Sequence, residues 1–168
     1  MHSKWRRAAA VVMAGMAVGA AAWSVEPGQP APLFELAGPK GTVSLQKLKG
    51  RVVYVDFWAS WCGPCRQSFP WMNEMQAKYG ARGLQIVGVN LDAQTGDAEK
   101  FLAQVPAAFA VAYDAKGDSA RRYELKGMPS SVLVGPDGKV IKVHAGFRQE
   151  DRKALEDAIV AALAATQP

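Results

Sequence analysis

Residues 55–65 of the 168-residue chain have the sequence Val-Asp-Phe-Trp-Ala-Ser-Trp-Cys-Gly-Pro-Cys. It holds Cys62 and Cys65, the only two cysteines in the sequence. Residues 52–58 are β-branched and aromatic around one acid, which predicts a buried strand. Residues 66–79 contain no glycine and predict a helix. We therefore expect the cysteines at a strand-to-helix turn, with Cys62 at the helix N-terminus.

This placement favours thiol–disulfide chemistry. A helix N-terminus carries unpaired N–H groups and about half a positive charge. Such an end stabilises a thiolate, so we expect the pKa of Cys62 to lie below the free value of about 8.5. Cys65 lies one helical turn further on and is expected to be buried. The pattern predicts a nucleophile, Cys62, with a second thiol that resolves its mixed disulfide.

Two structural explanations of the cysteine pair are weaker. A zinc site needs four ligands, and only His2 and His144 are available as histidine partners. A purely structural disulfide would close a four-residue loop and constrain the unfolded chain by only ~2 kcal/mol. A C-x-x-C pair beside a βαβ-like pattern is instead typical of redox proteins.

Residues 1–22 have the three parts of a secretory signal peptide. Three basic residues among the first seven are followed by a charge-free stretch at 8–22, and residues 20–22 are Ala-Ala-Ala, a small-x-small cleavage site. We expect cleavage after Ala22 and a periplasmic or other extracytoplasmic location, where disulfides persist. An uncleaved membrane anchor stays open as an alternative, although a spanning helix needs about 20 apolar residues.

The remaining chain suits one domain without nucleic-acid binding. The formal net charge is +5, of which Lys4, Arg6 and Arg7 supply three, so residues 23–168 carry +2. There is no basic patch interleaved with aromatic residues, as nucleic-acid binding would favour. We expect an extended arm at residues 23–32, rich in Pro and Gly, and a single α/β domain at residues 33–168.

Periodicity and turn residues predict the remaining elements of a mixed sheet with helices on both faces. A strand at 84–90 should run parallel to the first through a right-handed crossover. The other expected elements are hairpins at 33–45 and 131–144, helices at 95–104, 118–125 and 149–165, and a strand within 107–113.

Residues 55–65 resemble the active-site stretch of thioredoxins, and residues 28–165 resemble the exported thioredoxin-like proteins of the TlpA/ResA type. The resemblance implies a thioredoxin fold in which residues 92–125 form a central α/β insertion. It also implies that Pro129 is cis and, with Met128, faces the disulfide; an ordinary trans proline is the alternative. Trp61, Met128 and Pro129 are thereby expected to contact the substrate.

Asp56 is the most distinctive candidate beside the cysteines. Both alternating sets of side chains on its strand should be buried in a sheet covered on two faces, so burial should raise the pKa of this acid. Thioredoxins have an acid at this offset, which implies proton exchange with Cys65. An acid with a backbone or water partner and no catalytic part is the alternative. TlpA/ResA-type proteins often have Glu where this chain has Ser68.

These features together predict an exported thiol–disulfide oxidoreductase that reduces disulfides of exported proteins, such as apocytochromes c or copper-site proteins. A membrane thiol carrier would supply electrons, and we expect a monomer without cofactor or metal. The alternatives are a disulfide-forming oxidant and a module that binds Cu(I) on its two thiolates. His144 ends a predicted strand, and we expect it to be a lone, satisfied or exposed histidine.

Overall fold

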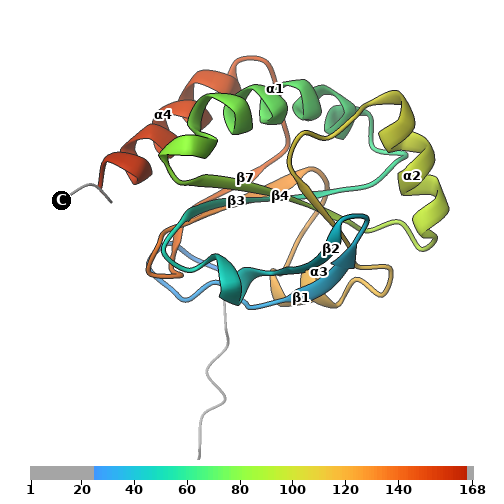
Figure 1. Ribbon diagram of the computed structural model, residues 1–168, viewed down its shortest axis with the longest axis horizontal. Helices are drawn as coiled ribbons and strands as arrows, with labels where there is room; N and C mark the ends of the chain where they lie inside the picture. Colours follow the sequence, from blue (N-terminus) through green and yellow to red (C-terminus); the bar gives the residue numbers. More distant parts are fainter. Residues whose placement is uncertain (1–24, 166–168) are drawn as a thin grey trace, which may run out of the picture.

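The computed structural model describes residues 25–165, and the predicted signal segment at 1–22 lies outside them. The predicted elements form in the expected order (Figure 1). The strands are β1 (Glu35–Gly38), β2 (Gly41–Ser44), β3 (Val52–Trp58), β4 (Leu84–Asn90), β5 (Ala110–Tyr113), β6 (Ser130–Val134) and β7 (Val140–Ala145). The α-helices are α1 (Gly63–Tyr79), α2 (Thr95–Gln104), α3 (Asp118–Arg122) and α4 (Asp151–Ala164), with short 3-10 helices at Leu45–Leu48 and Gly80–Arg82.

Strand β3 is the centre of a five-stranded mixed sheet with the order β5-β4-β3-β6-β7. β4 runs parallel to β3 and β5 runs parallel to β4, whereas β6 is antiparallel to β3 and β7 is antiparallel to β6. All seven residues of β3 are buried, as the run of β-branched and aromatic residues predicts. The parallel crossover from β3 to β4 through α1 is confirmed.

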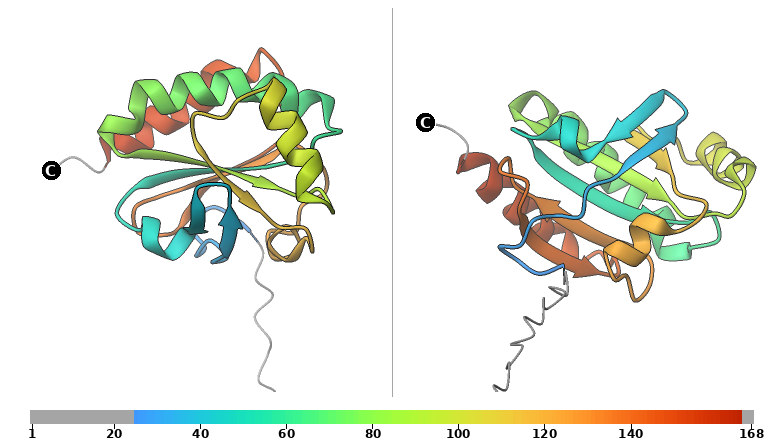
Figure 2. Two further views of the ribbon diagram at one scale, coloured as in Figure 1. Left: turned by 45° about the vertical axis from the view of Figure 1, so that its right-hand side comes forward. Right: turned by 90° about the horizontal axis from the view of Figure 1, so that it is seen from below.

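The two faces of the sheet have different covers (Figures 1 and 2). Helices α1, α2 and α4 contribute to the hydrophobic cluster on one face, which also contains both cysteines. The other face packs against the β1–β2 hairpin, a 3-10 turn and the residues that follow α3, including Tyr123. Helices thus lie on both faces, but the second face has only the five-residue α3 and is covered largely by the hairpin.

The predicted insertion at residues 92–125 consists of α2, β5 and α3. Its strand β5 forms one edge of the main sheet, and the N-terminal hairpin crosses close over it. A side chain at Gly38 of β1 would come within 2.1 Å of the Val111 carbonyl oxygen, so only glycine permits this approach. The insertion and the hairpin therefore form one packed unit.

The described part of the arm lies along the first residues of β7. The Gly28 N–H donates to the Val140 carbonyl at 2.8 Å, and the Val140 N–H donates to the Gln29 carbonyl at 2.8 Å. Helix α4 begins at Asp151, two residues after the predicted start at 149, and the Asp151 side chain accepts a hydrogen bond from the Arg148 N–H at 2.9 Å. Within residues 25–165, no helix is long and apolar enough to cross a membrane.

Candidate functional site

The two cysteines lie where β3 ends and α1 begins, as the sequence predicted. Cys62 is the N-cap residue of α1, and its Sγ accepts a hydrogen bond from the Cys65 N–H at 3.3 Å. The two residues form a disulfide in the structure. Pro64 lies in the first helical turn, where its missing N–H leaves no helical hydrogen bond unmade. After reduction, the same N–H and the positive end of α1 would stabilise a thiolate at Cys62.

The exposure of the site changes sharply within five residues. Trp61 is 74% exposed, whereas Cys62 is 5% exposed and Cys65 is fully buried. A partner that approaches the surface beside Trp61 therefore meets Cys62 before Cys65. The more exposed Cys62 is therefore suited to attack a substrate disulfide, and the buried Cys65 is suited to resolve the mixed disulfide that forms.

Asp56 lies in the centre of the sheet and is 2% exposed. Its strand neighbours Tyr54 and Trp58 belong to the cluster that contains both cysteines, so the Asp56 side chain is on the same face of β3 as α1. Its Oδ2 atom has no hydrogen-bond partner among the described residues. Burial in this cluster raises the pKa of Asp56 well above its usual value. Burial and a raised pKa suit a carboxyl group that accepts a proton, and the catalytic part of Asp56 stays a prediction.

Met128 and Pro129 come just before β6, at the end of the sheet where β3 leads to the cysteines. The Met128–Pro129 peptide bond is cis, as the resemblance implied. Ser130, the next residue, is the register partner of Phe57 near the end of β3. Met128 packs against the cluster that contains the two cysteines. The structure therefore brings these two residues to the end of β3 that leads to the disulfide, while their contact with substrate stays a prediction.

A buried carboxylate that the sequence analysis did not single out holds the loop before Cys62. Asp92 is 4% exposed and accepts hydrogen bonds from the Ser60 N–H at 3.0 Å, the Ser60 hydroxyl at 3.0 Å and the Asn90 side-chain amide at 2.8 Å. The Cys62 N–H closes the same turn by donating to the Ala59 carbonyl at 3.1 Å. A possible signal was the position of Asp92 just after β4, because the carboxyl ends of neighbouring parallel strands meet at one edge.

We expect Asp92→Ala to lower the free energy of unfolding by about 1 to 3 kcal/mol, because the Ser60 N–H loses a charged acceptor in a partly buried turn. Ser60→Ala removes only the hydroxyl contact, and about 1 kcal/mol is expected for it. Urea unfolding of the oxidised proteins measures both values. Equal losses in the two variants would show that Asp92 does not anchor the backbone of the turn.

His144 has an acidic neighbour that the sequence analysis did not predict. Its Nε2 atom lies 3.4 Å from Asp151 Oδ2 at the start of α4, and its side chain is 22% exposed. The distance between Nε2 and Oδ2 fits an ion pair, but the two atoms do not form a hydrogen bond. The chain separation of seven residues hid this contact, because it depends on how α4 packs back across β7.

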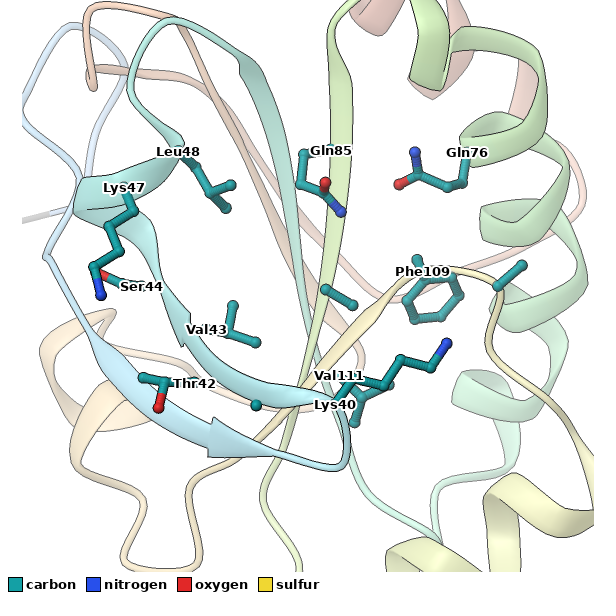
Figure 3. A pocket seen from close by; sticks show the side chains of 13 residues that line it. Lys40, Thr42, Val43, Ser44, Lys47, Leu48, Gln76, Gln85, Phe109 and Val111 are labelled. Carbon is teal, nitrogen blue, oxygen red and sulfur yellow. The ribbon is translucent and has the colours of Figure 1, made fainter.

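The groove in Figure 3 is separate from the disulfide. It has a volume of about 480 Å³ and lies between the β1–β2 hairpin, β5 and the end of α1, and none of the predicted site residues lines it. The Gln76 side chain caps the edge of β4 there: its Oε1 accepts from the Ile86 N–H at 2.7 Å. Among residues 25–165, no three Asp, Glu, His or Cys side chains converge in a way that could hold a metal ion.

Known proteins are similar to this chain in sequence and in fold. Residues 26–159 match the Redoxin family. The thiol-disulfide oxidoreductase ResA of Bacillus thuringiensis is 33% identical over 134 residues, which cover 79% of this chain and 76% of that protein. The solved structure of a thiol:disulfide interchange protein DsbE from Chlorobium tepidum is 62% identical, with a TM-score of 0.82 over 83% of this chain and 99% of that one. The chain therefore belongs to the Redoxin family and is a thiol–disulfide oxidoreductase of the ResA/DsbE type.

Proposed function

We propose that this protein is exported and reduces disulfides in other exported proteins. The observation that carries the proposal is the pair of cysteines at the start of α1, with Cys62 as N-cap and Cys65 buried behind it. The Gly-Pro dipeptide between them is that of thioredoxins and favours a reducing poise. The features of a signal peptide at residues 1–22 support export, and oxidised apocytochromes c or copper-site proteins are the substrates we favour.

The reaction has two exchange steps. Cys62, as thiolate, attacks a substrate disulfide; a mixed disulfide forms and one substrate thiolate leaves. Cys65 then transfers its proton to Asp56 and attacks the Cys62 sulfur, so that the Cys62–Cys65 disulfide forms and the second substrate thiolate is released. The substrate disulfide is reduced, the enzyme dithiol is oxidised, and a membrane thiol carrier restores it. Trp61, Met128 and Pro129 would hold the substrate chain beside Cys62.

The reduction potential of the Cys62–Cys65 pair tests the direction of this reaction. We expect equilibration with glutathione buffers to give a potential near that of thioredoxin, about −270 mV, rather than near the strong oxidants at about −120 mV. A value near the oxidants would overturn the reductase proposal in favour of disulfide formation. Equilibrium dialysis of the reduced protein with Cu(I) is the matching control, and tight, stoichiometric binding would favour the copper module instead.

Trapping in cells identifies the substrates. A Cys65→Ser variant retains the attacking thiol but has no resolving thiol, so its mixed disulfides should accumulate with the physiological substrates. Under the proposed function, the trapped proteins are exported and contain cysteines, and the Cys62→Ser variant traps none of them. Partners confined to the cytoplasm would contradict the proposed location.

A further inference from the structure

Strand β2 of the N-terminal hairpin has a free edge on the side of the groove in Figure 3. In the part of the chain that the structure describes, β2 pairs only with β1. The Leu45 N–H donates to the Phe34 carbonyl at 3.0 Å, one register step beyond the end of β2. Bonded and unbonded pairs alternate in an antiparallel ladder, so Thr42, three residues before Leu45, belongs to an unbonded pair. The Thr42 N–H and C=O therefore point away from β1, where a third strand could bind them.

The opposite wall of the groove offers no such edge. Strand β5 pairs with β4 only from Val87 onward, and the Gln76 side chain occupies the edge of β4 before that point. Gln76 accepts from the Ile86 N–H at 2.7 Å and donates to the Leu84 carbonyl at 3.3 Å. Apolar side chains, including Phe109, lie between this wall and the hairpin (Figure 3). A strand added to the groove would therefore pair with β2 and rest on an apolar floor.

The groove carries positive charge. Lys40 at the tip of the hairpin and Lys47 in the 3-10 helix after β2 line it, and no Asp or Glu is among its lining residues. Lys40 forms no ion pair among residues 25–165. Lys47 Nζ lies 3.9 Å from a Glu35 oxygen, but both side chains are more than half exposed, so this pair is weak. The two cations flank β2 in the chain and favour an acidic partner.

The same charges disfavour a second copy of this chain as the occupant. Antiparallel pairing of two β2 strands would bring Lys40 of each copy toward Lys47 of the other, because these residues lie just before and just after the strand. Like charges placed opposite each other destabilise a strand pair. A segment with carboxylates has the opposite effect, since it would pair with both cations.

We propose that this groove binds an extended, acidic segment of a partner protein, which adds to β2 as a third strand. The backbone of the segment exchanges hydrogen bonds with Thr42, and its apolar side chains rest on Phe109 and Val111. Its carboxylates lie beside Lys40 and Lys47. The volume of about 480 Å³ is within the range of ligand sites.

The groove is remote from the disulfide. Gln76 and Cys65 both belong to α1, and the eleven residues between these positions correspond to about 16 Å along the helix axis. A segment bound beside Gln76 therefore leaves Cys62 accessible, and the redox state of the disulfide should not change its affinity. The inference is thus independent of the proposed function, because binding in the groove requires no thiol.

Calorimetric titration with the acetylated and amidated peptide Ser-Glu-Val-Glu-Val-Glu-Ser tests the charge of the site. We expect the peptide to bind the oxidised and the reduced protein with equal affinity at low salt. The double variant Lys40→Gln, Lys47→Gln should bind it about 3- to 10-fold more weakly, because two exposed ion pairs are lost. Salt at about 0.5 M should weaken binding to the wild-type protein by a similar factor. The same peptide with Gln in place of Glu should bind more weakly than the acidic one.

Thr42→Pro tests the added strand. It removes the outward N–H but no hydrogen bond of the hairpin, and proline is tolerated at a free strand edge. We expect about 3- to 10-fold weaker peptide binding, whereas Thr42→Val keeps the N–H and should bind as the wild type does. Urea unfolding checks that both variants fold. Hydrogen exchange needs no variant: the peptide should protect the Thr42 N–H of the wild-type protein.

Three results would overturn the proposal. The first is a wild-type protein that does not bind the peptide. The second is unchanged affinity in folded Thr42→Pro or in the lysine double variant, with no protection of the Thr42 N–H. The third is a dimer in analytical ultracentrifugation that Thr42→Pro dissociates, since a second copy would then occupy the edge. The proposed function would survive each of them, because it fails only if the wild-type protein does not reduce protein disulfides.

Discussion

Cys62→Ser is expected to lower the rate of disulfide reduction by at least about 1,000-fold, because a serine hydroxyl is not ionised near neutral pH and cannot replace a thiolate. Cys62 caps α1, and the Cys65 N–H points at its sulfur from 3.3 Å. No second thiol can substitute, since Cys65 is fully buried and the chain has no other cysteine. Reduction of insulin with dithiothreitol as the electron source measures the loss.

Cys65→Ser is the matched control, because it removes the other sulfur of the same disulfide. This variant should react once at a normal rate and then stop as a mixed disulfide, which mass spectrometry detects. In the reduced wild-type protein, pulse alkylation should label Cys62 first, with a thiol pKa below about 8.5. Faster labelling of Cys65, or a normal first reaction in Cys62→Ser, would exchange the roles of the two cysteines.

Asp56→Asn is expected to slow resolution of the mixed disulfide by roughly 10- to 1,000-fold near pH 7 while leaving the first attack by Cys62 nearly unchanged. A buried thiol such as Cys65 is mostly protonated at that pH and needs a base when it attacks. Asparagine preserves the size of the side chain but cannot accept the proton. The defect should shrink at high pH, where hydroxide deprotonates the thiol. Stopped-flow release of the second substrate thiol measures this step.

The same substitution should stabilise the protein, and more so at high pH. Burial raises the pKa of Asp56 in the folded state above the unfolded value of about 3.9. The folded protein therefore holds its proton more tightly, and the cost of burying this acid grows as pH rises above the unfolded value. We expect Asp56→Asn to gain about 1 to 3 kcal/mol in the free energy of unfolding at pH 8 and little at pH 4.

Urea unfolding of the oxidised proteins at the two pH values tests this prediction. A loss of stability at every pH would mean that the carboxylate is paired in the native protein, and the premise of a general base would fall. A gain in stability with normal resolution would instead make Asp56 a buried acid without a catalytic part. Both results leave the assignment of Cys62 intact, because that assignment depends on the end of α1 rather than on the strand.

Local sequence determined the scaffold and the reactive centre. The β-branched and aromatic residues of β3 favour a strand over a helix, and the glycine-free run after Cys65 is long enough for a helix, so strand, turn and helix followed directly. Cys62 and Cys65 are close in the chain, and helix geometry alone sets their relation to the N-terminus of α1. The burial of Asp56 followed from the alternation of side chains on a strand covered on both faces.

Tertiary structure decided the contacts between residues that are far apart in the chain. Asp92 meets Ser60 because β3 and β4 are parallel neighbours that end at the same edge, and no local pattern encodes the partner of a strand. His144 lies across the sheet from Ser131 and Asp56 only because of the registers of β6 with β3 and of β7 with β6. A register shift of one residue would turn these side chains to the opposite face, so the three residues share one face only once the hydrophobic faces of the whole sheet have been packed.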